Sequence, residues 1–165
     1  MTDDSEGIKF IADEMLGKLA KWLRTIGYDT TYYRDGADSG LVQIALVENR
    51  IILTRDTHLI ERKLARNCVL IKSDNVWEQF EQIVRELDLD TKSRLFTRCL
   101  ICNKELKLAE KEYVRDLVPP YVYQTQNEFY KCLECGRIYW PGTHKDSMLE
   151  LLNSIGDRTN SSTLD

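Results

Sequence analysis

Short apolar runs alternate with segments of helical periodicity along the first half of the chain. Runs rich in β-branched and aromatic residues predict four strands, at residues 8–12, 30–33, 51–54 and 68–71. After each run, apolar residues recur at three- and four-residue spacing, and the clearest of the four predicted helices covers residues 76–87. Strands and helices that alternate with short connections predict a mainly parallel sheet with helices on its faces.

Polar and small residues mark where these helices begin and end. Gly27 follows the first helix, as expected of a residue that adopts positive φ easily. Asp38 or Ser39 is expected to cap the second helix. Asn75, with Glu78 three residues later, fits a capping box at the start of the fourth.

The pattern changes after a segment at residues 89–96 that is expected to be a linker. Beyond it come paired cysteines, two adjacent prolines, and two β-type stretches at 121–123 and 137–140. Residues 147–155 are expected to form a last helix. We therefore expect one domain at 7–90, a second module at 91–155 and a flexible tail at 156–165.

Composition restricts the classes of function. The chain has 165 residues, of which 42% are hydrophobic and 30% charged, typical of a soluble globular protein. No apolar run is long enough to cross a membrane and the first residues are acidic, so a cytoplasmic location is expected. The formal charge is −4 and both halves are slightly acidic. Binding of a phosphate backbone therefore requires a local basic patch or a bound metal ion.

Four aspartates come at or shortly after the ends of the predicted strands: Asp13, Asp38, Asp56 and Asp74. Parallel strands deliver their carboxyl ends to one edge of a sheet, so these side chains are expected to converge. Two carboxylates about 5 Å apart repel by roughly 3 kcal/mol at an effective dielectric of 20. Such a group is stable with raised pKa values, basic partners or divalent cations, which makes a metal site one interpretation.

Each aspartate also has a plain structural alternative. Asp13 and Asp56 are equally suited to favour the positive end of the helix that follows them. Asp38 is more often a helix cap than a ligand, and Asp74 competes with Asn75 for such a role. Asp35 precedes a glycine and is expected to be a turn residue.

Basic residues accompany these acids. Lys18, Lys21 and Arg24 recur at three-residue spacing on the first predicted helix, and Arg55 precedes Asp56. They are suited to guide a phosphodiester backbone toward the acids, and Arg55 to hold a phosphate. A solvated helix face explains the three helical residues equally well.

The strongest single signal is a pair of C-x2-C motifs, Cys99 with Cys102 and Cys132 with Cys135. Each motif supplies two thiolates, and two motifs complete a four-sulfur zinc site that leaves no position open for substrate. Two disulfides or a redox pair are the alternatives, but a cytoplasmic chain rarely keeps disulfides, and a thioredoxin-type motif occurs once, at a strand-to-helix turn. Cys68, in an apolar strand, is expected to be a small core residue.

Several motifs together resemble one protein family. The residues Phe10 to Asp29, Ile52-Leu-Thr-Arg-Asp56, Arg98-Cys-Leu-Ile-Cys-Asn103, Val118-Pro-Pro-Tyr-Val122 and Tyr139-Trp-Pro-Gly-Thr-His144 occur in order and with the expected spacing. The chain resembles the PIN-like ribonuclease domain with a C-terminal zinc ribbon, named for its place at the carboxy terminus of Mut-seven-type exonucleases. The resemblance covers residues 8–152.

The resemblance implies a PIN-like α/β/α fold followed by a zinc ribbon. It also implies a hydrolase, a ribonuclease that cleaves single-stranded RNA with Mg²⁺ or Mn²⁺. By motif position, Asp13, Asp38 and Asp56 match the metal-binding acids, and Asp74 lies where a further catalytic acid occurs. The match around Asp38 is loose because Asp35 is only three residues away. The four cysteines match structural zinc ligands.

Two other functional classes compete with a nuclease. A phosphoacceptor receiver domain also places acids after its first and third strands, but it requires a fifth strand-helix unit with a lysine, where this chain has the linker and the cysteines. A noncatalytic adaptor that binds RNA or a protein partner through the ribbon is the more serious alternative. Tyr121, Tyr123, Tyr139, Trp140 and His144 of the ribbon are suited either to stack on unpaired bases or to form its small core.

Overall fold

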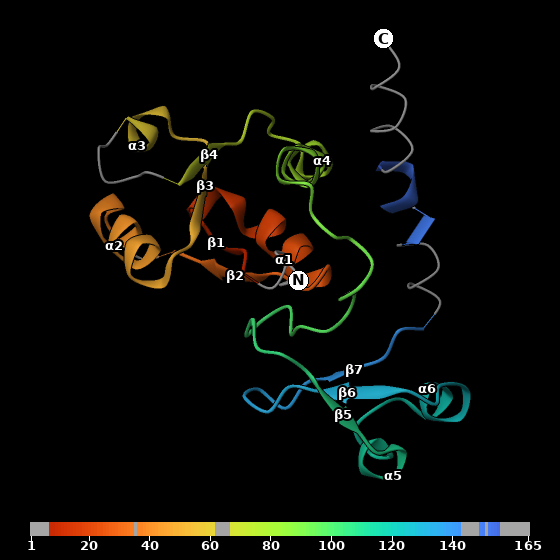
Figure 1. Ribbon diagram of the computed structural model, residues 1–165. Coiled ribbons are helices and arrows are strands. Elements are labelled where there is room, and N and C mark those ends of the chain that lie inside the picture. Colours follow the sequence, from red (N-terminus) through yellow and green to blue (C-terminus); the bar gives the residue numbers. More distant parts are fainter. Residues whose placement is uncertain (1–6, 35, 62–66, 143–148, 151, 156–165) are drawn as a thin grey trace. The chain divides into compact units, whose positions relative to one another are not determined.

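The computed structural model describes residues 7–34, 36–61, 67–142, 149–150 and 152–155 (Figure 1). The chain divides into two compact units, residues 1–95 and 96–165. Asp35, the basic residues Arg62, Lys63 and Arg66, and His144 lie outside the described residues. None of the helices in the described part of the chain has both the length and the apolar character that crossing a lipid bilayer requires.

The first unit is built on a four-stranded sheet in which every pairing is parallel. Its strands are β1 (Lys9–Ala12), β2 (Asp29–Tyr32), β3 (Ile51–Thr54) and β4 (Cys68–Leu70), in the order β2-β1-β3-β4. The parallel sheet expected from the alternation of strands and helices is thus confirmed.

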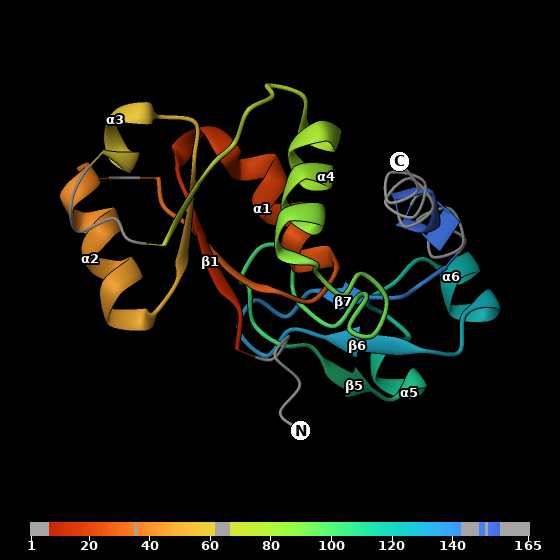
Figure 2. The same cartoon turned by 45° about the horizontal axis from the view of Figure 1, so that its top comes forward.

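Helices cover both faces of this sheet, which gives the α/β/α arrangement expected from the resemblance (Figures 1 and 2). On one face, α1 (Gly17–Thr25) packs against α4 (Val76–Leu87) through Trp22, Trp77 and Phe80, whose ring centroids lie 5.3–5.8 Å apart. On the other face, α2 (Asp38–Glu48) and the short α3 (Thr57–Ile60) bury Leu41 and Leu59 against Ile11 and Ile52 of the sheet.

The strand order creates a topological switch point between β1 and β3. From β1 the chain passes through α1 to β2 on one side, and then returns through α2 to β3 on the other side of β1. The connections that leave the carboxyl ends of β1 and β3 lead to α1 and α3, which lie on opposite faces of the sheet, so the two connections diverge between these strand ends. Open α/β sheets bind ligands at this position.

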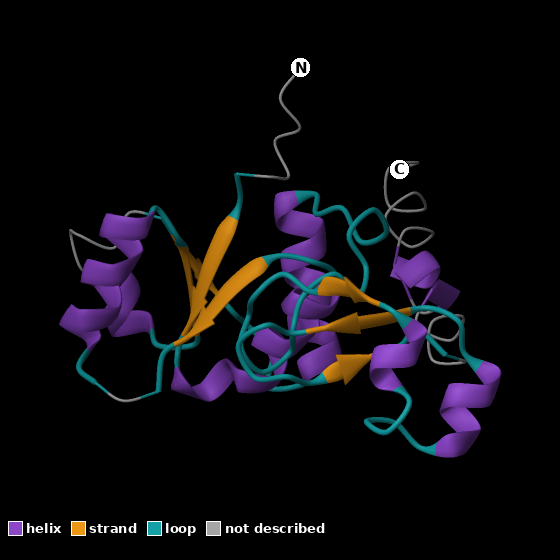
Figure 3. Cartoon of the chain, turned by 90° about the horizontal axis from the view of Figure 1, so that it is seen from below, coloured by secondary structure: helices purple, strands orange, loops and turns teal. Residues whose placement is uncertain are grey.

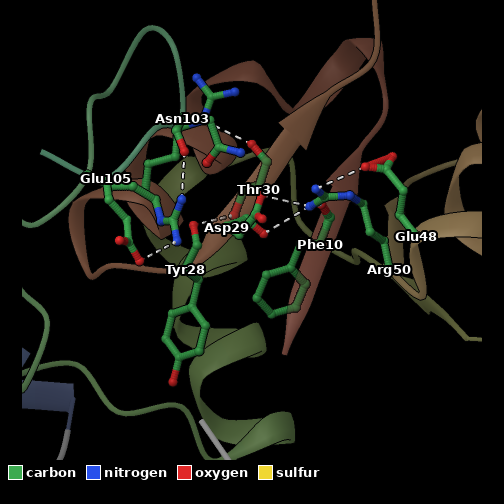
Figure 4. A network of polar contacts seen from close by, with 10 residues as sticks. Phe10, Tyr28, Asp29, Thr30, Glu48, Arg50, Asn103 and Glu105 are labelled. Atoms are coloured by element: carbon green, nitrogen blue, oxygen red, sulfur yellow. Dashed lines mark hydrogen bonds and ion pairs between the residues drawn. The ribbon is translucent and has the colours of Figure 1, made fainter. Parts of the chain in front are cut away.

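The opposite edge of the sheet, at the amino ends of the strands, is held by one buried arginine. Arg50 is 7% exposed, and its Nη1 donates to the Phe10 carbonyl at 3.1 Å and to Asp29 Oδ1 at 2.8 Å. Its Nη2 pairs with Glu48 Oε1 at 3.4 Å. Figure 4 shows how this guanidinium joins β1, β2 and the end of α2.

The predicted helix boundaries are confirmed in two cases and wrong in one. Gly27 follows α1 with φ of 97°, and Asn75 Oδ1 accepts from the Glu78 amide at 3.1 Å at the start of α4. The Asn75 amide donates to Ser73 Oγ, so Ser73 rather than Glu78 completes the cap. Helix α2 is not capped by Asp38 or Ser39, because the extended residue Ala37 occupies the N-cap position and Asp38 is already helical.

The second unit contains a small antiparallel sheet, in the order β5-β6-β7, and two short helices (Figure 3). Its elements are β5 (Lys107–Ala109), α5 (Lys111–Val114), α6 (Pro120–Thr125), β6 (Phe129–Lys131) and β7 (Ile138–Tyr139). Ala109, Val114, Val118 and Phe129 form its core, with Trp140 packed against them. Of the expected last helix, residues 149–150 and 152–155 are helical.

The β-type stretch predicted at residues 121–123 is wrong, because these residues belong to α6. Pro120 lies in the first turn of the helix, where proline's fixed φ favours helix and its missing N–H has no intrahelical acceptor to lose. Aromatic and β-branched composition favours strands only weakly, and here the proline and the apolar core determine the outcome.

Candidate functional site

Asp13 directly follows β1 and is held by three polar contacts. Its amide donates to the Leu53 carbonyl of β3 at 3.1 Å, its Oδ1 accepts from the Met15 amide at 3.0 Å, and its Oδ2 accepts from Thr54 Oγ1 at 2.5 Å. The helix-cap role expected as an alternative is therefore present, since Asp13 caps the 3-10 helix η2 (Glu14–Leu16). The carboxylate is nevertheless half-exposed and each oxygen retains a second lone pair.

Asp56 lies two residues beyond β3, on the other side of the switch point. Its amide donates to Thr54 Oγ1 at 3.0 Å, and its Oδ1 accepts from the His58 amide at 2.9 Å, which caps α3. The hydroxyl of Thr54, a fully buried residue, thus donates to Asp13 and accepts from Asp56. One side chain thereby joins the two acid-bearing loops.

Thr54 was not among the residues predicted from the sequence. A signal for it exists, because side chains two residues apart in a strand point to the same side. Thr54 and Asp56 have that spacing at the end of β3. What the sequence lacks is the information that β1 pairs with β3, which places Asp13 within reach of the Thr54 hydroxyl.

Asp38 and Asp74 also lie beyond the carboxyl ends of strands, farther along the chain from β2 and β4 respectively. Both side chains are exposed. Asp38 is the first residue of α2, and its carboxylate has no hydrogen bond or ion pair within the described part of the chain. All four predicted acids therefore follow strands at the same edge of the sheet, and the Thr54 hydroxyl directly joins the loops of Asp13 and Asp56.

The acids do not form a ready-made metal cage. Across residues 7–34, 36–61, 67–142 and the described part of the last helix, the only group of three or more candidate ligands with mutually close ligand atoms consists of cysteines. The edge does fit a hard divalent cation in its chemistry. Carboxylate oxygens are the donors that Mg²⁺ prefers, and Mg²⁺ is usually bound by one or two carboxylates together with water and substrate phosphates.

The four predicted basic residues differ in their environments. Lys18 and Lys21 are exposed on α1. Arg24 is only 8% exposed and its Nε donates to the Thr30 carbonyl at 2.9 Å, so this guanidinium joins α1 to β2. Arg55 is half-buried, and its Nε has no hydrogen-bond partner within the described residues.

Cys68 in β4 is half-buried. Burial, and secondarily the negative charge of Asp13, raises the pKa of the Cys68 thiol to about 11. The side chain therefore stays a neutral thiol at physiological pH, and it packs against the core cluster of α2 and β3 as expected.

The four predicted zinc ligands come together in the second unit. The sulfur atoms of Cys99, Cys102, Cys132 and Cys135 all lie within 4.8 Å of one another, and Cys99 Sγ is 3.8 Å from Cys135 Sγ. Zn–S bonds of about 2.3 Å in a tetrahedron place sulfur atoms roughly 3.8 Å apart. The 3.8 Å separation of Cys99 and Cys135 exceeds a disulfide bond of about 2.05 Å, and all the cysteines are free thiols. The geometry fits a four-thiolate zinc site.

The two cysteine motifs have the same backbone hydrogen bonds. In the first, the Cys99 amide donates to the Lys104 carbonyl at 2.8 Å and the Asn103 amide to the Cys99 carbonyl at 3.0 Å. In the second, the Cys132 amide donates to the Arg137 carbonyl at 3.0 Å and the Gly136 amide to the Cys132 carbonyl at 2.9 Å. Asn103 and Gly136 have φ of 65° and 76°, as these tight turns require.

Tyr139 supports this site from outside the ligand set. Its hydroxyl lies 3.1 Å from Cys99 Sγ and accepts from the Leu100 amide at 3.3 Å. Because an amide only donates, the hydroxyl proton is available to the sulfur, and such outer contacts fix the orientation of a metal ligand. Of the aromatic residues expected to stack on bases or form the core, Tyr123 and Trp140 pack against the core. Tyr121 is 75% exposed.

Comparison with known proteins agrees with this architecture. The family model described as the Mut7-C RNAse domain matches residues 8–152, which include the parallel sheet, the acids at its edge and the cysteine site. Curated protein sequences give no significant match. Because the family match extends over most of the chain, this protein belongs to the Mut7-C RNase domain family, a ribonuclease family.

Proposed function

We propose that the protein is a Mg²⁺- or Mn²⁺-dependent ribonuclease that hydrolyses phosphodiester bonds of single-stranded RNA. Membership of a ribonuclease family supports the reaction class. The observation that carries the assignment to this edge of the sheet is the Thr54 hydroxyl, which joins the Asp13 and Asp56 loops on either side of the switch point. A catalytic site at this edge requires that the two loops keep a fixed position relative to each other.

In this proposal Asp13 and Asp56 hold the divalent ion, with Asp38 and Asp74 as further acids from the neighbouring strands. An ion bound there lowers the pKa of a coordinated water and offsets charge on the attacked phosphate. The chain's part is to orient its carboxylates. Thr54 Oγ1 and the Met15 amide each occupy one lone pair of Asp13, and the remaining lone pairs face a half-exposed environment.

The basic residues of the first unit supply the attraction for the RNA backbone. Lys18 and Lys21 are exposed on the helix that follows Asp13, and Arg55 directly precedes Asp56. The Nε of Arg55 is buried, so only the rest of its guanidinium is a candidate for pairing with a phosphate oxygen. Arg24 is excluded from this role because its guanidinium is buried between α1 and β2. Water attack in line with the leaving group leaves a 5′-phosphate and a 3′-hydroxyl.

The first prediction concerns the two acids. Asp13→Asn and Asp56→Asn keep a side-chain oxygen for the capping hydrogen bonds but remove the negative charge that binds a cation. We expect both variants to fold and to cleave a fluorescent single-stranded RNA at least about a hundredfold more slowly than wild type in Mn²⁺, because metal assistance is worth several kcal/mol. A duplex RNA of the same sequence should be cleaved poorly by wild type.

A matched control is available at Asp88. This residue is exposed and ends α4 with φ of 50°, a conformation that asparagine adopts readily. Asp88→Asn should cleave at the wild-type rate. Equal rates for wild type, Asp13→Asn and Asp56→Asn would overturn the proposal of metal-dependent catalysis at this edge.

One observation favours the second candidate, a noncatalytic adaptor that binds a partner through the ribbon. Among the described residues, most of the exposed large hydrophobic side chains belong to the second unit, namely Ile101, Leu108, Tyr113, Leu117, Tyr121 and Leu133. A contiguous exposed apolar surface marks an interaction site, and these side chains are the candidates for one. Metal-dependent cleavage that is lost in both aspartate variants rejects a purely noncatalytic function and leaves the ribbon free to bind RNA or a protein.

A further inference from the structure

The carboxyl end of β2 carries two adjacent tyrosines whose hydroxyls reach in different directions. Tyr32 Oη donates to the Glu14 carbonyl at 2.6 Å, and Tyr33 Oη donates to the Ala37 carbonyl at 3.1 Å. Consecutive side chains of a strand point to opposite faces of a sheet. One tyrosine therefore contacts the turn that follows β1, and the other contacts the start of α2.

Each hydroxyl donates to the carbonyl of a residue that is adjacent in sequence to one of the predicted acids. Glu14 directly follows Asp13, and Ala37 directly precedes Asp38. We propose that Tyr32 and Tyr33 are positioning residues that hold Asp13 and Asp38 in place on either side of β2. This inference rests on the proposed function, since it concerns the acids assigned there to the metal ion.

The position of Asp38 should depend on Tyr33 more strongly than the position of Asp13 depends on Tyr32. Asp13 is already held through its amide and both carboxylate oxygens. The carboxylate of Asp38, by contrast, has no hydrogen bond or ion pair among the described residues, so its position depends on where α2 begins. The Ala37 carbonyl, which accepts from Tyr33, also accepts from the amides of Gly40 and Leu41 in the first turn of α2. Tyr33 therefore secures the first turn of the helix that carries Asp38.

Glycines leave room for both tyrosines. A Cβ atom added at Gly40 would lie 2.4 Å from Tyr33 Oη and 3.4 Å from Tyr33 Cζ, so only the hydroxyl is in its way. A Cβ atom at Gly17, in the first turn of α1, would lie 3.1 Å from Tyr32 Oη and Cζ. Gly40 is helical and gains nothing from positive φ, so alanine there is otherwise expected to favour the helix.

These distances define the experiment. In the zinc-loaded full-length protein, Tyr33→Phe removes the hydroxyl, and Gly40→Ala displaces it without removing it. We expect each variant to bind Mn²⁺ roughly three- to tenfold more weakly than wild type, as measured by the electron paramagnetic resonance of free Mn²⁺, because each loses one fixing hydrogen bond. The Mn²⁺ concentration for half-maximal cleavage should rise equally, with KM for RNA unchanged.

The double variant Tyr33→Phe/Gly40→Ala separates this mechanism from general damage. Both changes act on one hydroxyl, so the double variant should bind Mn²⁺ as weakly as either single variant and no weaker. Tyr121→Phe is the matched control, since this exposed tyrosine has no hydroxyl partner within the described residues, and it should bind Mn²⁺ like wild type.

The outcomes distinguish the two proposals. If wild type binds Mn²⁺ no better than Asp13→Asn, the proposed metal site fails and this inference fails with it. If wild type binds Mn²⁺ and Asp13→Asn does not, while Tyr33→Phe and Gly40→Ala bind like wild type, the site stands and the positioning role is rejected. Additive losses in the double variant would also reject it, because the two changes would then act independently.

Discussion

At the scale of single residues, the two edges of the parallel sheet are held in different ways. At the amino edge, Arg50 makes buried hydrogen bonds to β1 and β2 and an ion pair with Asp29. At the carboxyl edge, the smaller Thr54 hydroxyl joins two loops whose carboxylates stay accessible to solvent. The buried ion pair between Arg50 and Asp29 thus lies at the amino edge. At the carboxyl edge, the carboxylates of Asp13 and Asp56 keep oxygen lone pairs that can bind a cation.

Replacing Arg50 tests the amino edge. Arg50→Ala leaves Asp29 and the Phe10 carbonyl without this donor, and we expect the free energy of unfolding to fall by about 3 kcal/mol. Urea denaturation followed by circular dichroism measures the change. Arg85→Ala is the control, because Arg85 pairs with Glu81 at 3.5 Å while 43% exposed, and its loss should cost less than about 0.5 kcal/mol. If Arg50→Ala destabilised the protein as little as Arg85→Ala, Arg50 would not hold the amino edge of the sheet as described here.

At the scale of elements, the two units are stabilised by different means. The first unit buries helices on both faces of a sheet, and Trp22, Trp77 and Phe80 form an aromatic group between α1 and α4. In the second unit, strands of two or three residues and helices of four and six surround a small core. A core of that size needs an additional cross-link for stability, and the four cysteines are placed to provide it by binding zinc.

Zinc removal should therefore affect one unit only. We expect one zinc per chain, and we expect a strong chelator to make residues 96–165 sensitive to proteases while the first unit stays resistant. Limited proteolysis with mass spectrometry measures this difference. Cys132→Ser should behave like the chelated protein, and Cys68→Ser, outside the site, like the untreated one. Less than about half a zinc per chain, or a protease-resistant ribbon after chelation, would contradict the structural role.

Acid should release the same metal. Hydrogen bonds from the Arg137 amide and side chain lower the pKa of the Cys135 thiol to about 6. A thiol whose pKa is lowered in the folded state stabilises the fold fully above its ordinary pKa of 9.0, and this contribution falls as the pH drops through the folded value. Because zinc binds thiolates, protonation of the ligands should release the metal as the pH is lowered, and the zinc content after dialysis at stepwise lower pH measures this release.

At the scale of the whole molecule, charge limits how RNA is held. The net charge is −4, so the protein as a whole does not attract a polyanion. Of the four basic residues predicted to contact RNA, Lys18, Lys21 and Arg55 remain in the proposal, and Arg24 is buried. With so few basic side chains, we expect a modest electrostatic affinity for RNA. The bound metal ion should then contribute a larger part of the binding free energy.

Salt dependence measures this number of contacts. For single strands, the slope of log affinity against log salt is about −0.7 per neutralised phosphate, so three contacts predict a slope of roughly −2. The Asp13→Asn variant, in which cleavage should be at least about a hundredfold slower, is suitable for measuring the binding of a fluorescent RNA at several salt concentrations. Lys21→Gln should reduce the slope by about 0.7. A slope steeper than about −5 would show a larger basic surface than the one proposed here.

Local pattern was sufficient to predict a large part of the fold. The alternation of apolar runs with segments of helical periodicity predicted the four strands and the parallel sheet. This worked because the residue period of a strand and that of a helix are each set by backbone geometry within a few residues. The spacing of the cysteines predicted the zinc site for a similar reason, since each C-x2-C motif folds into its turn locally. The strand predicted at residues 121–123 failed where this local information was ambiguous.

The sequence by itself therefore determined the strands and helices of the first unit, the grouping of the four cysteines and the placement of the acids after strands. Only the tertiary structure decided that β1 and β3 are neighbours, that Thr54 joins the loops of Asp13 and Asp56, and that Arg24 is buried. It also decided that Tyr33 binds the start of the helix that carries Asp38. The physical reason is that strand order and burial depend on which distant segments pack together, and residue spacing along the chain does not encode that packing directly.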